Sequence, residues 1–198
     1  MNDPFYDGLL KRWCPPLSAE PRFICAFQKI RDIPYGSTGE REPEIIVSNN
    51  LGSCSGKHIL LNHLFKKLGF QSKIMTCLHH FDQALPTGNN YPQRLQKIIC
   101  DHRVLDFHHF IKLKVDQEWF NVDATWDSPL NAYGFPVNLD WQGKGHTTIA
   151  VQPIKFYPET ENIIALKEQL ISELPSKERR IRAEFLELLT KWFREIRS

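Results

Sequence analysis

FHHFIKLKVDQEWFNVD, residues 107–123, carries the clearest β pattern in this sequence. Side chains alternate between the two faces of a strand, so the apolar positions in each half should share one face. A turn of even length pairs Leu113 with Phe120 and Ile111 with Val122, which buries both apolar sets together. The stretch therefore predicts an antiparallel hairpin in this register.

The same register has a consequence for two polar side chains. It pairs Phe110 with Asp123, so Asp123 lies diagonal to His108 on the face away from the apolar layer. Diagonal neighbours are within reach of a hydrogen bond between an imidazole and a carboxylate. A two-residue turn at 116–117 gives this register, although Asp-Gln is not a favoured pair there, and a four-residue turn over 115–118 keeps it.

A cysteine stands where a flexible loop meets a predicted helix. Residues 52–56 read GSCSG, and a helix is expected over Cys54–Leu68 with Ser53 as its N-cap and Gly69 at its C-terminal cap. Unpaired backbone N–H groups at a helix N-terminus lower the pKa of a thiol, and the thiolate is the nucleophile. Cys54 is thus a candidate nucleophile, against the alternative of a small buried residue at a turn.

A cysteine nucleophile needs a general base, and the base needs an acceptor that orients it. The hairpin supplies His108 as the base and Asp123 as the acceptor. The adjacent His109 points into the apolar layer in this register, so we interpret it as structural. The residues alone therefore indicate a Cys54–His108–Asp123 catalytic triad.

These motifs resemble the transglutaminase-like superfamily, which is similar in fold to papain-type cysteine proteases. The resemblance covers roughly residues 25–126 and suggests a divergent member of bacterial or archaeal type. The family pattern is Gly-x-Cys, then His-x-aromatic, then Trp-x-x-x-Asp-x-Thr. This chain carries it at Gly52–Cys54, His108–Phe110 and Trp119–Thr125.

The resemblance implies a role for each residue of the triad. Cys54 would be the nucleophile, His108 the general base and acid, and Asp123 the orienting group. Two positions depart from the pattern: many members have alanine where this chain has His58, and tryptophan where it has Phe110. For the oxyanion hole, the backbone N–H of Cys54 is a natural donor, and Asn49 or Asn50 could supply a second.

The remaining patterns predict an α+β fold, with the Cys54 helix packed on an antiparallel sheet and helices at the C-terminus. We expect residues 1–158 to form the catalytic domain and residues 159–198 a helical extension packed on it. The further elements expected are two helices within 1–34, the second over 22–31, a loop over 36–50, a strand over 73–78, a loop over 79–100 that ends in a short helix, a long loop over 127–146, a final strand over 147–151, and two helices in the tail separated at Pro175.

Composition excludes several classes of function. The formal net charge of +2 leaves no basic footprint for nucleic acid or an anionic membrane, and no apolar run approaches the length of a transmembrane span. The N-terminus lacks the pattern of a secretory signal, which favours a cytoplasmic protein. The five cysteines are odd in number and thinly spread, so we expect reduced thiols packed as small hydrophobic residues.

The leading functional hypothesis is acyl transfer or amide hydrolysis through a thioester at Cys54, without a cofactor. The substrate would be a protein, peptide or other amide, the acceptor water or an amine, and the oligomeric state stays open. An arylamine N-acetyltransferase-like enzyme is a second possibility, but no Gly-rich phosphate loop for coenzyme A is visible. A non-catalytic binding module is a third.

A zinc site is the fourth possibility, because the chain contains eight histidines. Adjacent histidines on a strand, such as His79-His80, point to opposite faces. His58 and His63 are five residues apart on a helix and share a face poorly. The sequence therefore disfavours a metal site.

Overall fold

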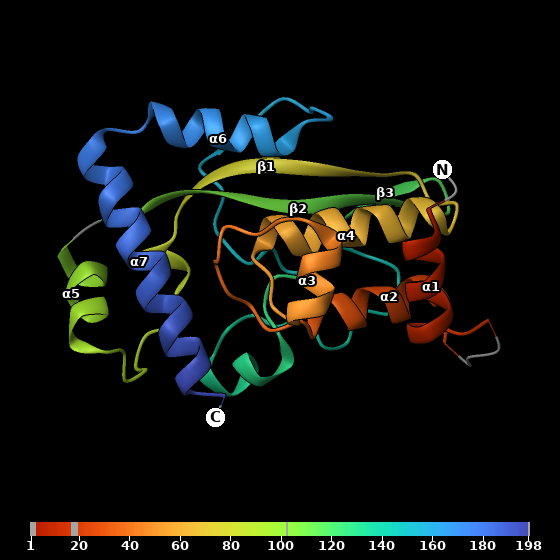
Figure 1. Ribbon diagram of the computed structural model, residues 1–198, viewed down its shortest axis with the longest axis horizontal. Coiled ribbons are helices and arrows are strands. Elements are labelled where there is room, and N and C mark those ends of the chain that lie inside the picture. Colours follow the sequence, from red (N-terminus) through yellow and green to blue (C-terminus); the bar gives the residue numbers. More distant parts are fainter. Residues whose placement is uncertain (1–2, 17–19, 102, 198) are drawn as a thin grey trace.

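The computed structural model describes residues 3–16, 20–101 and 103–197 as helices packed on an antiparallel sheet (Figure 1). The mixed α+β class expected from the sequence is confirmed. The elements in chain order are α1 (Pro4–Trp13), α2 (Arg22–Arg31), α3 (Pro43–Asn49), α4 (Cys54–Lys67), β1 (Ser72–His80), α5 (Gln93–Asp101), β2 (Leu105–Val115), β3 (Glu118–Val122), β4 (Lys155–Phe156), α6 (Ile163–Glu173) and α7 (Ser176–Glu195), with short 3₁₀ turns over Asp82–Ala84 and Ser128–Tyr133.

The four strands are all antiparallel and follow the spatial order β3-β2-β1-β4. Leu113 pairs with Phe120 and Ile111 with Val122, so the register predicted from the apolar pattern is confirmed. The connection is the two-residue turn, and φ is 49° at Asp116 and 72° at Gln117. Both turn residues thus adopt the left-handed conformation that matches the twist of a tight hairpin.

Helix α4 packs on the sheet and carries Cys54 as its first residue. Its apolar stripe, formed by Leu60, Leu61, Leu64 and Phe65, is fully buried in one core with Ile111 and Leu113 of β2. Gly69 follows the helix with a φ of 88°, a conformation that costs a glycine little. This packing fixes the N-terminus of α4 against the strands.

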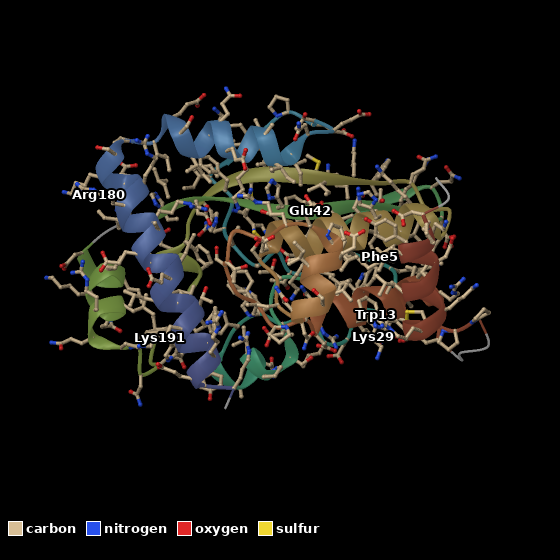
Figure 2. The ribbon with its side chains drawn as sticks, in the orientation of Figure 1. Phe5, Trp13, Lys29, Glu42, Arg180 and Lys191 are labelled. Atoms are coloured by element: carbon tan, nitrogen blue, oxygen red, sulfur yellow. A yellow bond between two sulfur atoms is a disulfide. The ribbon has the colours of Figure 1, made fainter. Side chains whose placement is uncertain are left out.

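A second core lies under α7, at the end of the molecule away from α1 and α2 (Figure 1). The helix-spaced stripe of the tail is buried there, including Phe185, Leu189 and Trp192. This face of α7 is therefore part of the hydrophobic core. Exposed side chains such as Arg180 and Lys191 lie on α7 outside this core (Figure 2).

Helices α6 and α7 both pack on β2. In Figure 1, α6 and α4 lie on opposite sides of β1 and β2. The division into a catalytic domain over 1–158 and an extension over 159–198 stays a prediction. None of the described helices is long and apolar enough to cross a membrane.

Two expected elements are wrong. The loop expected over 36–50 contains helix α3, which starts at a proline in its first turn. The strand expected over 147–151 does not form, and the last strand is instead β4, which pairs with β1. The segment is rich in β-branched residues but forms no strand, because backbone groups there bind side chains: the N–H of Thr148 donates to Asn138, and that of Ala150 donates to Asp123.

The expectation of reduced thiols is wrong for two of the five cysteines. Cys14, at the end of α1, forms a disulfide with Cys25 of α2, and their Cα atoms are 5.8 Å apart. The bond is visible beside Trp13 in Figure 2. Cys54, Cys77 and Cys100 are free. The pairing arises because α1 and α2 pack side by side, which cysteine counting alone does not reveal.

Candidate active site

Three elements bring Cys54, His108 and Asp123 to one buried place. Cys54 begins α4, His108 lies in β2, and Asp123 follows the last residue of β3. The Nε2–H of His108 donates to Oδ2 of Asp123 over 2.7 Å. Cys54 is 5% exposed, and the other two are 2% exposed. The hairpin therefore joins His108 to Asp123 as its register predicts, while the catalytic roles stay a prediction.

Asp123 is fixed by more than the imidazole. Its Oδ2 also accepts from the N–H of Ala150, and its Oδ1 accepts from the N–H of Thr125. Burial alone would raise the pKa of this carboxyl, but the charge and hydrogen bond of His108, followed by the charge of His58 and the N–H of Ala150, lower it below its ordinary range. Asp123 is thus an ionised acceptor held in one orientation.

The electrostatics of the site favour a charged pair. Burial disfavours charge on Cys54, but the ammonium of Lys167 and the imidazoles of His108 and His109 lower the pKa of the thiol well below its ordinary value. Burial likewise opposes charge on His108, but Asp123 and Cys54 raise its pKa to about 10. Both shifts favour a thiolate beside an imidazolium over a neutral thiol beside a neutral imidazole.

His109 is closer to the chemistry than the sequence indicated. Its ring is buried, with Nδ1 2.9 Å from Oγ of Ser55, the residue that follows Cys54. It also lowers the pKa of Cys54. Burial lowers the pKa of His109 itself to about 4, so the ring is neutral. The interpretation of His109 as only a structural residue of the apolar layer is therefore incomplete.

His58, the first departure from the family pattern, links two parts of the site. Its Nδ1–H donates to the carbonyl oxygen of Cys54 over 2.8 Å, and its Nε2 accepts from the N–H of Ala124 over 2.9 Å. Nε2 lies 3.6 Å from Oδ1 of Asp123. Burial lowers the pKa of His58 to about 4, so one neutral tautomer satisfies both bonds. This imidazole ties the start of α4 to the chain beside Asp123.

Lys167 of α6 is a site residue that the sequence analysis missed. Its Nζ lies 3.9 Å from Sγ of Cys54 and donates to Oγ of Ser55 over 3.2 Å and to the carbonyl of Phe107 over 2.5 Å. The side chain is buried, as Lys167 is 4% exposed. A signal was present in the sequence, because a lysine stands between Ile163 and Leu170 on the apolar face of a helix.

Asn49 and Asn50, the asparagines considered for the oxyanion hole, precede Cys54 at the end of α3, and their role stays a prediction. Asn49 ends α3 and Asn50 follows it with a φ of 46°, and both side chains are exposed. The side chain of Cys54, by contrast, is buried. Within the described parts of the chain, no group of three or more His, Cys, Asp or Glu side chains is arranged to hold a metal ion.

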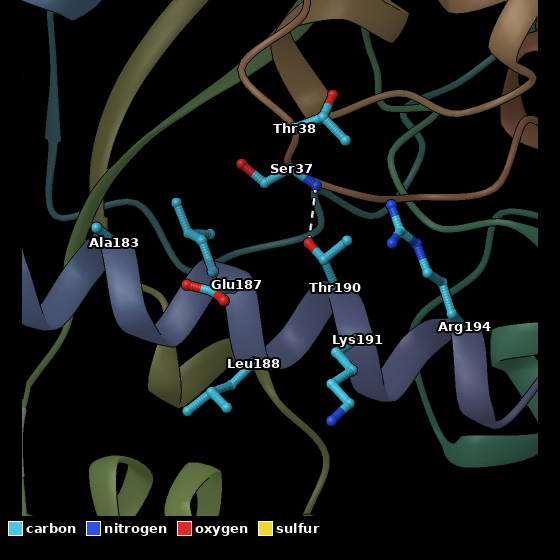
Figure 3. A pocket seen from close by; sticks show the side chains of 9 residues that line it. Ser37, Thr38, Ala183, Glu187, Leu188, Thr190, Lys191 and Arg194 are labelled. Carbon is cyan, nitrogen blue, oxygen red and sulfur yellow. Dashed lines mark hydrogen bonds between the residues drawn. The ribbon is translucent and has the colours of Figure 1, made fainter.

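A surface cavity of about 460 Å³ lies between the chain at Ser37 and Thr38 and the outer part of α7 (Figure 3). Thr190 of α7 accepts a hydrogen bond from the N–H of Ser37 at its edge. Its lining residues are Ser37, Thr38, Ala183, Leu186, Glu187, Leu188, Thr190, Lys191 and Arg194. This cavity is separate from the buried Cys54 site.

Comparison with known proteins gives a distant structural likeness. No protein-family model matches the sequence, and no curated protein matches it. Among solved structures, the chain is similar to a protein from Cytophaga hutchinsonii that is assigned provisionally as a cysteine protease. The two are 16% identical with a TM-score of 0.43, and the match covers 65% of this chain and 39% of that one. The matched region is thus well under half of that protein's length.

Proposed function

We propose that this protein is a cysteine enzyme of the transglutaminase-like type, with a papain-like arrangement of its core. It transfers an acyl group, or hydrolyses an amide, through a thioester at Cys54. The observation that carries the proposal is His108, whose ring donates to Asp123 and lies against the low-pKa thiol of Cys54. The substrate is a protein, a peptide or another amide. It binds the domain formed by residues 1–158, on which the protein's own C-terminal helices pack.

The charged pair supports a two-step reaction. The thiolate of Cys54 attacks the amide carbonyl, and the imidazolium of His108 gives its proton to the departing amine, which leaves a thioester and a neutral imidazole. His108 then takes a proton from water or from an acceptor amine as that group attacks the thioester. Cys54 leaves as the thiolate, so the starting pair of thiolate and imidazolium is restored. Asp123 keeps the ring oriented throughout.

The test is capture of the acyl-enzyme. The protein is mixed with an activated acyl ester and with a mixed pool of peptides carrying a glutamine, and the intact mass and the modified residue are followed by mass spectrometry. We expect one acyl group on Cys54, with none on Cys54→Ala. His108→Ala should acylate about 10²–10⁴-fold more slowly. Cys100→Ala, which changes an exposed free thiol, is the matched control and should behave as the unaltered protein.

Acylation that persists at the same rate in Cys54→Ala would refute the proposal. A second candidate, a non-catalytic binding module that keeps the fold, is favoured by one observation: Cys54 is only 5% exposed. Iodoacetamide separates the two near pH 6.5. An activated thiolate at Cys54 alkylates faster than Cys100, whereas an inert buried thiol alkylates more slowly.

A further inference from the structure

We propose that Lys167 is a further catalytic residue, whose ammonium stabilises the thiolate of Cys54 and is delivered by α6. The inference deepens the proposed function, because it concerns the charge of the nucleophile on which that function rests. Lys167 touches the reacting atom, with Nζ 3.9 Å from Sγ. Lys167 is 113 residues from Cys54 in sequence. Its ammonium can therefore stabilise the thiolate only while α6 is packed against the rest of the protein.

The position of Lys167 demands a compensating charge. The buried residues of α6 are Ile163, Lys167 and Leu170, so the ammonium occupies the centre of the face that packs on the protein. An ammonium buried without an anion is costly. A carbonyl and a hydroxyl accept its hydrogen bonds, but neither carries a charge. The negative charge must come from a nearby acidic group.

The nearest carboxylate is largely used by another cation. Asp106 of β2 lies 4.0 Å from Nζ of Lys167, but it accepts from the guanidinium of Arg182 of α7 over 2.7 Å. Asp123 is likewise engaged by His108. Lys167 therefore shares Asp106 with Arg182. The thiolate of Cys54 is a second anion within reach of its ammonium.

With His108 protonated, the charges around this site balance when Cys54 is ionised. The cations are then Lys167, Arg182 and His108, and the anions are Asp106, Asp123 and the Cys54 thiolate. Moving the proton from His108 to Cys54 leaves the total charge unchanged, so Lys167 favours the ionised pair through its contact with Sγ. The other titratable groups that face this site are His58 of α4, Cys77 and His79 of β1, His109 of β2, and Tyr35, and burial favours the neutral form of each.

Ultraviolet absorbance of the thiolate near 240 nm tests the proposal without any substrate. The absorbance of the full chain is measured against pH, and the curve of Cys54→Ser is subtracted. Replacing the ammonium by an apolar chain of similar length, in Lys167→Met, should raise the midpoint by about 1–3 pH units. Lys167→Arg keeps the charge and should stay near the unaltered midpoint. Lys177→Met, which changes an exposed lysine at the start of α7, is the matched control.

Lys167→Gln, which keeps a donor for the Phe107 carbonyl, is the second variant if Lys167→Met does not fold. Circular dichroism establishes folding before each titration. An unchanged midpoint in either folded neutral variant overturns the role of Lys167. Failure of the proposed function would give a different result: no acyl-enzyme would form, but Lys167→Met would still shift the midpoint of thiolate formation. A missing shift with normal acylation refutes Lys167 alone.

Discussion

The carbonyl oxygen of Cys54 lies 2.8 Å from Nδ1 of His58, one helical turn further along α4. The same ring accepts a hydrogen bond from the N–H of Ala124 beyond the hairpin, so one neutral imidazole connects the backbone of Cys54 to the segment that follows Asp123. A side chain at this position thus holds together two parts of the site that are far apart in sequence.

We predict that His58→Ala destabilises the protein, because it leaves the buried N–H of Ala124 unpaired and removes the side-chain donor to the carbonyl of Cys54. An unpaired buried group costs about 1–3 kcal/mol. His58→Gln, whose amide oxygen can reach the N–H of Ala124, should lose less. His63→Ala, on the half-buried face of the same helix, should cost about 1 kcal/mol or less. Urea unfolding measures all three, and equal losses for His58→Ala and His63→Ala would contradict the bridging role.

The histidines should fall into two groups by their pKa values when they are titrated and followed by NMR. The pKa of His108 is raised to about 10 by Asp123 and Cys54, despite burial, so this ring stays protonated through pH 8. Burial lowers the pKa of His58 and His109 to about 4 and that of His79 to about 3. These three rings should stay neutral above pH 5. Titration of His108 near pH 6.5 would contradict the charged pair.

The same values set the pH dependence of stability. The unfolded chain protonates His58, His79 and His109 near pH 6.5, whereas the folded chain does so only near pH 3 to 4. The unfolded state therefore binds more protons in this window, and stability falls as pH falls from 6.5 toward 4. The contribution of His108 has the opposite sign: it is complete below pH 6.5 and is lost as pH rises through 10.

Lys57 should be among the costliest residues to replace outside the triad. Its Nζ is fully buried and donates to the carbonyls of Arg31, Ile33 and Thr125 over 2.7–2.9 Å. Lys57→Met would leave three buried carbonyls without this donor, and we expect a loss of about 3 kcal/mol or more in urea unfolding. Lys66→Met, an exposed lysine on α4, should change stability by no more than about 0.5 kcal/mol.

The disulfide gives a fifth prediction. Titration of thiols in denaturant should find three free groups, since Cys14 and Cys25 are joined. Replacing both by serine removes a cross-link between residues that are 11 positions apart in sequence. We expect this to lower the free energy of unfolding by about 2–3 kcal/mol. Cys100→Ser should have no comparable effect. Five free thiols in the unreduced protein would show that the pair does not form in solution.

The hairpin could be predicted from sequence because its signal is local and its period is two. A slip of one residue between Ile111 and Val122 would expose every apolar side chain, so the register has one good solution. The amphipathic helices α2, α4 and α7 followed for a similar reason. Helix α3 is seven residues long, too short for its period to stand out from a loop rich in Gly and Pro.

The surroundings of Cys54 could not be predicted in the same way. Lys167 reaches the sulfur through tertiary packing of α6 on β2, and nothing in the residues beside either one specifies that contact. The segment over 147–151 has the β-branched composition of a strand, yet two of its N–H groups donate to the side chains of Asp123 and Asn138. Sequence periodicity reports which face of an element is buried, but not which polar groups meet inside.

The depth of Cys54 also bears on the oxidation of its thiol. A thiolate is the form of cysteine that peroxides and disulfides attack, so an activated thiol in open solvent is readily lost to oxidation. Here Lys167 lies against the sulfur, and Cys54 as a residue is 5% exposed. The same packing of α6 that places a cation beside the sulfur therefore also covers it from solvent.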